Sequence, residues 1–148
     1  MKTLQLGFTL CFLFISAIAV KAQTPTFERQ PLFKNAAQKL PAAISELEKA
    51  FTVKEGSEVT FQFNNFKFTG TVQTSIKRYE NLYSVIIKST SLNNTLLSLS
   101  KRINDDKTIT YVGRMINETS VDGYELVQNT DGTYTFHKIQ TEDLIQDF

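Results

Sequence analysis

The sequence has few of the residues that most often build reactive or metal-binding sites. Its 148 residues include one Cys, one His and no Trp. A single thiol excludes a framework of intrachain disulfides. One Cys and one His also cannot provide the four Cys and His ligands of a structural zinc site. These absences exclude disulfide scaffolds and Cys/His metal clusters.

The composition is nevertheless that of a folded protein. Hydrophobic residues make up 41% of the chain, aromatic residues 11%, and the formal net charge is +1. A chain of this kind can bury enough apolar surface to offset the entropy lost on folding. Its length suits one domain of ordinary size.

The N-terminal residues 1–22 have the pattern of a signal peptide. A Lys lies near the start, and an apolar run of 13 residues extends from Phe8 to Val20. A membrane span needs about 20 residues, so this run is short for one. Ala22 provides the small residue that precedes a cleavage site. Cleavage after Ala19 and a retained N-terminal anchor are the alternatives.

Export would change both charge and thiol content. Removal of residues 1–22 leaves 14 basic and 15 acidic residues and no Cys, because Cys11 lies in the apolar run. We expect a secreted or periplasmic protein without a transmembrane segment after cleavage. A nucleic-acid-binding protein would show a basic excess, so nucleic acid is not expected as a partner.

Residues 23–31 form a polar lead-in with two prolines, and one helix is expected after it. Apolar residues recur at spacings of four and three, which is typical of an amphipathic helix: Phe33, Ala37, Leu40, Ile44, Leu47 and Phe51. Pro41 interrupts this stripe and is tolerated in the first turn of a helix. We therefore predict a break near Leu40 and a helix from Pro41 to about Phe51, with its apolar side facing the core.

From residue 58 onward the apolar period changes to two, which indicates strands. Residues 58–63 and 66–72 flank Asn64-Asn65, a dipeptide suited to a tight hairpin turn. A two-residue loop would place Phe63 opposite Phe66 and Phe61 opposite Phe68. All four rings would then lie on one face, together with Val59 and Val72, and Gln62 would pair with Lys67 on the other.

Further alternating segments follow without intervening helices. They contain Tyr83 to Ile87, Leu97 to Leu99, residues 108–116, Tyr124 to Leu126 and Tyr134 to Phe136. Short strands at hairpin spacing favour an antiparallel meander. The predicted fold class is α+β: one N-terminal amphipathic helix packed on about seven short strands, as a curved sheet or partly open barrel, in a single domain over residues 32–148. A short helix over residues 142–146 or a frayed tail would end the chain.

No catalytic, cofactor-binding or metal-ligating residue is expected. His137 is the only His, and its neighbour Phe136 would point inward while His137 points outward. The closely spaced acids at 46/48, 105/106 and 142/143 are explained by a solvated helix or turns. A turn at residues 129–132 resembles part of a calcium loop but lacks its first and last acidic ligands. The sequons at Asn93 and Asn117 matter only in a glycosylating host. We expect no enzyme.

The remaining expectation is binding. The predicted function is that of an exported non-enzymatic domain that binds a protein or cell-envelope partner, whose identity stays open. The outward strand residues form its candidate partner-binding face: Gln73, Ser75, Ser98, Ser100, Thr110, Arg114 and Glu125. Free strand edges would allow a partner to add a strand. The alternative is a carrier that holds a small apolar ligand in a cavity of the sheet.

Overall fold

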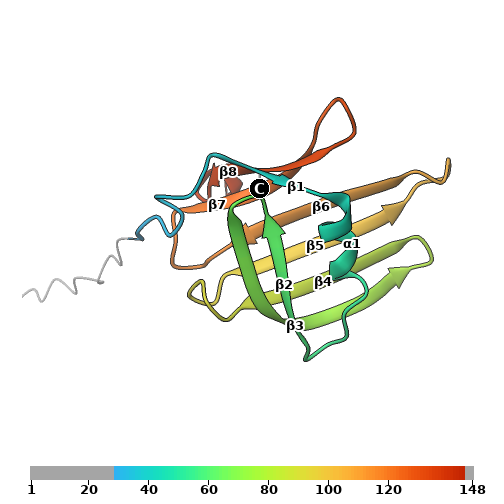
Figure 1. Ribbon diagram of the computed structural model, residues 1–148, viewed down its shortest axis with the longest axis horizontal. Helices are drawn as coiled ribbons and strands as arrows, with labels where there is room; N and C mark the ends of the chain where they lie inside the picture. Colours follow the sequence, from blue (N-terminus) through green and yellow to red (C-terminus); the bar gives the residue numbers. More distant parts are fainter. Residues whose placement is uncertain (1–28, 146–148) are drawn as a thin grey trace, which may run out of the picture.

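The computed structural model describes residues 29–145, which form a single antiparallel sheet and one short helix (Figure 1). The sheet has eight strands in the order β1-β8-β7-β6-β5-β4-β3-β2 and curls into a half-barrel. Each strand from β2 to β7 therefore pairs with the next along the chain, and β8 also pairs with β1. The prediction of an α+β meander is confirmed, with one strand more than expected.

The strands contain the alternating segments of the sequence, but several are longer than predicted, and β3 ends at Tyr79 and not at Val72. The elements are β1 (Lys39–Ala42), α1 (Ile44–Ala50), β2 (Glu58–Phe63), β3 (Phe66–Tyr79), β4 (Leu82–Ser89), β5 (Leu96–Ile103), β6 (Ile109–Ile116), β7 (Asp122–Gln128), β8 (Tyr134–Gln140) and the short 3₁₀ helix η1 (Asp143–Ile145). The last of these replaces the predicted helix over residues 142–146. Residues 1–22 and most of the lead-in lie outside the described residues.

The prediction of a helix starting at Pro41 is wrong, because Pro41 lies in β1. Leu40 and Ala42 are buried while Lys39 and Pro41 are exposed, so the period here is two. The N–H of Lys138 donates to the carbonyl of Gln38, which places the Leu40 N–H on the β8 side and the missing N–H of Pro41 on the free edge. Proline is tolerated there. Helix α1 starts only at Ile44.

The hairpin of β2 and β3 has the predicted register. Phe63 pairs with Phe66, Phe61 with Phe68, and the turn residue Asn64 has a φ of 54°. Phe61, Phe63 and Phe68 are fully buried. A shift of one residue would expose these rings to water, which explains why the pattern alone defines the register.

Aromatic rings fill the inside of the half-barrel. The ring centroids of Phe63 and Phe136 lie 5.0 Å apart, so the β2 end of the sheet contacts the β8 end through its side chains. The ring centroids of Phe61 and Phe68 lie 6.4 Å apart. Alternate residues of the central strands complete this core: Val85, Ile87, Leu97, Leu99, Tyr111 and Met115. We call this side of the sheet the inner face.

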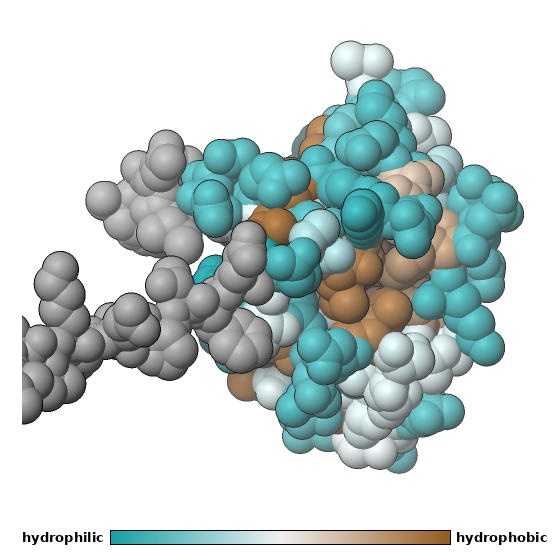
Figure 2. Space-filling view, turned by 90° about the vertical axis from the view of Figure 1, so that its left-hand side faces the viewer, coloured by the Kyte–Doolittle hydropathy of each residue, from teal (hydrophilic) through white to brown (hydrophobic). Residues whose placement is uncertain are grey.

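Two segments cover the inner face. Helix α1 buries Leu47 and Ala50 against it. Near the N-terminal end of the described chain, Phe33 packs edge-on against Tyr124, whose hydroxyl donates to the carbonyl of Ala37 at 2.6 Å. Apolar atoms reach the surface between polar residues on the side shown in Figure 2. No helix among residues 29–145 is long and apolar enough to cross a membrane.

Candidate binding face

The opposite side of the sheet, which we call the outer face, is built from the residues that alternate with the core. Helix α1 and the N-terminal segment both pack on the inner face. The register aligns one row of outer positions across seven strands, from β3 to β1: Thr74, Ile86, Ser98, Arg114, Glu125, His137 and Lys39. His137 thus points outward, as predicted, and it is half-buried.

Five of the seven predicted face residues lie together on this outer face. Ser98, Arg114 and Glu125 are direct neighbours in the row described above. Ser100 lies one position further along β5, paired with Ser84 and Val112. Thr110 follows on β6 and pairs with Arg102.

Gln73 and Ser75 do not join this group, because β3 contains a bulge. The register shifts between Val72, which pairs with Ile87, and Thr74, which pairs with Ile86. Beyond the shift Ser75 pairs with the buried Val85, so it occupies an inner-face position. Its backbone N–H donates to the Glu55 carboxylate at 2.7 Å. Strict alternation from Val72 places Ser75 on the wrong face, and nothing in the sequence marks the extra residue.

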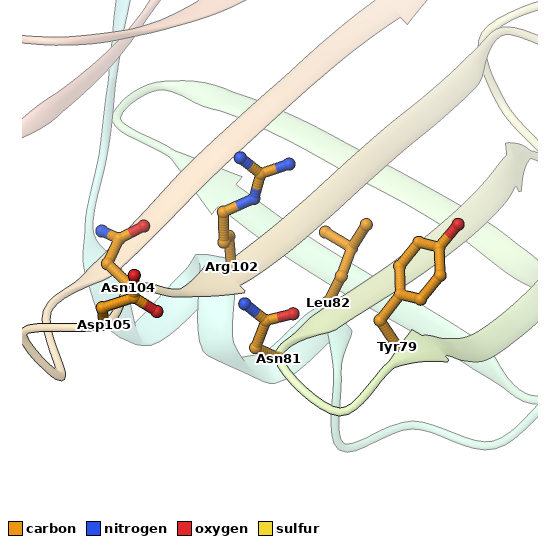
Figure 3. Close-up of a pocket in the computed structure, with 6 residues that line it drawn as sticks. All are labelled: Tyr79, Asn81, Leu82, Arg102, Asn104 and Asp105. Carbon is orange, nitrogen blue, oxygen red and sulfur yellow. The ribbon is translucent and has the colours of Figure 1, made fainter.

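Three adjoining depressions on the outer face share lining residues and form one continuous groove, which we call the outer groove. The first, of about 360 Å³, lies at the β4 and β5 ends (Figure 3) and is lined by Tyr79, Asn81, Leu82, Arg102, Asn104 and Asp105. The second, of about 240 Å³, is lined by Leu82, Ser100, Arg102, Asn104, Thr110 and Val112. The third, of about 310 Å³, is lined by Ser98, Ser100, Val112, Gly113, Arg114, Glu125 and Leu126.

The third depression lies where β6 and β7 separate. These strands pair only through Arg114 with Glu125 and Met115 with Tyr124. Closer to the start of β6, the N–H of Tyr111 donates to the Tyr134 hydroxyl at 3.2 Å instead of to a carbonyl of β7. The wedge between the two strands is therefore closed on the inner side by the Tyr134 ring and open on the outer side.

Two arginines in the outer groove have different surroundings. Nε and Nη2 of Arg114 both donate to Oε1 of Glu125, at 3.0 and 2.8 Å. The guanidinium of Arg102 has no hydrogen-bond or ion-pair partner among residues 29–145, and in Figure 3 it points away from Asp105. The hydroxyl residues Ser100 and Thr110 line the same depression as Arg102, and Thr110 is its register partner on β6.

The sequence-based selection of face residues omitted nine residues that line the outer groove, among them Leu82, Arg102 and Val112. The period-two pattern contained the signal for two of them, because Arg102 follows Ser98 and Ser100 at steps of two and Val112 lies between Thr110 and Arg114. Val112 is apolar, yet it is 57% exposed.

A second polar cluster holds α1 to the sheet. The carboxylate of Glu48 accepts hydrogen bonds from Lys101, at 2.7 Å, and from the Tyr111 hydroxyl. Burial opposes ionisation of Glu48, but the two hydrogen bonds and the positive charge of Lys101 together lower its pKa. Burial and the Glu48 carboxylate raise the pKa of Tyr111. Residues 29–145 contain no group of three or more His, Cys, Asp or Glu side chains that could hold a metal ion.

The two sequons differ in accessibility. Asn117 is buried, and its amide donates to the Asn93 carbonyl at 2.6 Å and to Thr95 at 3.2 Å. Its side-chain oxygen also accepts the N–H of Thr119. The folded chain therefore offers only Asn93, which is exposed, to a glycosylating enzyme.

Comparison with protein-family models, curated proteins and solved structures finds no match to this chain. No residue role in the outer groove is therefore carried over from another protein. Its function has to follow from its own geometry and chemistry.

Proposed function

We propose that this chain is an exported, non-enzymatic domain that binds a protein or cell-envelope partner through the outer groove. The observation that supports this most directly is the continuous groove across the outer face, while aromatic rings fill the inner face. Export is supported by the pattern of residues 1–22.

The lining of the outer groove suits recognition of another molecule. It combines arginine, hydroxyl groups and exposed apolar side chains, here represented by Arg102, Ser100 and Val112. Arginine is enriched at protein interfaces, where it provides charge, several donors and a flat surface for packing. A groove of this mixed character favours a polar ligand with some apolar side chains.

Binding of a partner by strand addition is less suited to this chain, because both edge strands of the sheet, β1 and β2, are protected. On β1, Pro41 lacks an N–H at the free edge. On β2, Glu46 accepts the N–H of Gln62 at 2.8 Å, and Lys49 donates to the carbonyl of Thr60 at 3.0 Å. Side chains of α1 thus bind the edge groups that a partner strand would need.

The proposal is tested by capturing partners from the exported fraction with the wild type and two matched variants. Val112→Asp places a charge in the outer groove. Val127→Asp places the same charge on another exposed outer-face Val, outside the groove lining. We expect wild type and Val127→Asp to recover one stoichiometric partner and Val112→Asp to lose it. Equal recovery by both variants, or no partner at all, would contradict the proposal.

A carrier of a small apolar ligand is the second candidate. One open depression supports it, of about 710 Å³ and mostly apolar, lined by Pro41, Ala42, Ala43, Ile44, Asn64, Thr133, Tyr134 and Thr135. A carrier should retain a lipid-like molecule after purification, detectable by mass spectrometry, and should lose it in the variant Ile44→Asp. The absence of any such molecule from the native protein would eliminate this candidate.

A further inference from the structure

Charges are distributed unevenly between the outer face and the rest of the described chain. Residues 29–145 contain 14 basic and 13 acidic residues, so they are nearly balanced. Six exposed cations lie on the outer face, five of them by strand register and Arg78 by its contact with Ser84: Lys39, Lys67, Arg78, Lys88, Arg102 and Arg114. Only two acids share strand positions on that face, Glu58 and Glu125. Most remaining acids lie on α1 or in turns.

Arg78 lies at the irregularity between Lys77 and Tyr79, so its contacts and not a register partner place it on this face. Its Nε donates to the hydroxyl of Ser84 at 3.2 Å, and Ser84 is an outer-face residue paired with Ser100. By contrast, Lys101 and Lys138 occupy inner-face positions, where they bind Glu48 and the carbonyl of Phe33. Of the six outer-face cations, only Arg114 has an ion-pair partner among residues 29–145, which is Glu125.

Within the outer groove, Arg102 is the cation best placed to bind an anion from solution. Arg114 is already paired with Glu125, whereas Arg102 has no partner in the described part of the chain. An arginine guanidinium binds a carboxylate through two parallel hydrogen bonds. Asp105 lines the same end of the groove and is the one acid that would compete or repel there.

Apolar residues beside Arg102 distinguish among the classes of anionic partner. Leu82 lines the groove next to Arg102, and Val112 lies across the shared depression. Ile76 occurs in the same outer row as Val112 and is 43% exposed. Sulfated polysaccharides offer no aliphatic groups to such side chains, and a flat lipid surface would touch only a strip of a convex sheet. A protein segment offers both carboxylates and aliphatic side chains.

We propose that the outer groove recognises an acidic protein segment, in which a carboxylate pairs with Arg102 and an adjacent aliphatic side chain packs on Leu82 and Val112. This inference rests on the proposed function and adds the chemistry of the partner. The other exposed cations of the outer face, such as Lys88 and Arg78, attract such a segment over a longer range.

The test is a titration of the expected mature protein, residues 23–148, with a fluorescent peptide of alternating Glu and Leu. A Gln/Leu peptide, heparin, and phosphatidylcholine vesicles containing phosphatidylglycerol serve as comparison probes. We expect only the Glu/Leu peptide to bind well. Its affinity should decrease as the NaCl concentration is raised from 50 to 300 mM. Arg102→Gln should weaken this binding about tenfold, the loss of roughly 1.4 kcal/mol expected for one charged contact.

Lys54→Gln is the matched control, because it removes one exposed positive charge from the turn after α1, away from the outer groove. Equal weakening by Lys54→Gln and Arg102→Gln, or no binding of the Glu/Leu peptide, would overturn the inference. Tighter binding of heparin or of the vesicles, lost in Arg102→Gln, would overturn it in favour of another anion.

The two proposals fail in different ways. If Val112→Asp loses the captured partner while Arg102→Gln retains it at every salt concentration, the groove binds a partner but not through a carboxylate. The proposed function then stands and the inference about an acidic segment does not.

Discussion

The inner and outer faces of the sheet use the same strands for different tasks. Strand β5 shows this most clearly, because Leu97 and Leu99 are buried in the core while Ser98 and Ser100 line the outer groove. The inner face is covered at one end by α1 and at the other by residues near Phe33. The packing that stabilises the fold is therefore concentrated on one face, which leaves the residues of the other face less constrained by packing.

The largest expected effect comes from removing an inner-face ring. Phe61 is fully buried and contacts Phe63 and Phe68, so Phe61→Ala leaves a cavity and should cost about 3–5 kcal/mol of unfolding free energy. Urea unfolding followed by circular dichroism measures this loss. Val112→Ala on the outer face should change the same quantity by less than about 0.5 kcal/mol. Similar losses in the two variants would contradict the division between the faces.

The inner face is also the part of the structure that the sequence predicts best. Pairing of Phe61 with Phe68 and of Phe63 with Phe66 follows from alternation and a two-residue turn, and it is observed. Here burial makes every change of register costly, so the hydrophobic pattern and the structure agree.

The outer groove was less predictable, because it depends on departures from regular pairing. The bulge near Gln73 moves Ser75 to the inner side, and the separation of β6 from β7 creates the third depression. The prediction of a helix starting at Pro41 failed for a related reason. The burial of Leu40 fits a helical spacing as well as an edge strand, so it did not distinguish the two. None of these features changes the local hydrophobic pattern, so none was visible in it.

The attachment of α1 gives the next largest effect. Glu48→Gln removes the charge that binds Lys101 and the Tyr111 hydroxyl, and should cost about 1–3 kcal/mol. Urea unfolding at pH 7 measures this change. Ser45→Ala, an exposed substitution on the same helix, is the control and should leave the unfolding midpoint unchanged.

The same variant should alter the dependence of stability on pH. The pKa of Glu48 is lowered in the folded state, so its contribution is complete above its ordinary value of 4.5 and is lost as the pH falls through the folded-state pKa. Between pH 7 and pH 3.5, Glu48→Gln should therefore lose less stability than the wild type. An equal loss in both proteins would show that Glu48 does not contribute to acid destabilisation.

The protected edge of β2 supplies a prediction about association. Glu46→Ala frees the N–H of Gln62 and removes the partner of Lys49, so the β2 edge gains an unpaired donor facing solvent. We expect this variant to form dimers or larger species at high protein concentration, as measured by light scattering. Glu55→Ala, which removes a carboxylate from the N–H of Ser75 on β3, tests whether any exposed edge has this effect. A monomeric Glu46→Ala would mean that α1 itself blocks the edge.

The smallest expected effect lies on the outer face itself. Arg114 and Glu125 form an ion pair at 2.8 Å, but their side chains are 48% and 38% exposed. Water and salt screen such a pair, so a double-mutant cycle with Arg114→Gln and Glu125→Gln should give a coupling of about 0.2–1 kcal/mol in the free protein. If the outer groove binds an acidic segment, the Glu125→Gln variant should bind it more tightly, because Arg114 is then free to pair with a second carboxylate. A coupling well above this range would instead assign the pair a structural role, joining β6 to β7 at the point where the two strands separate.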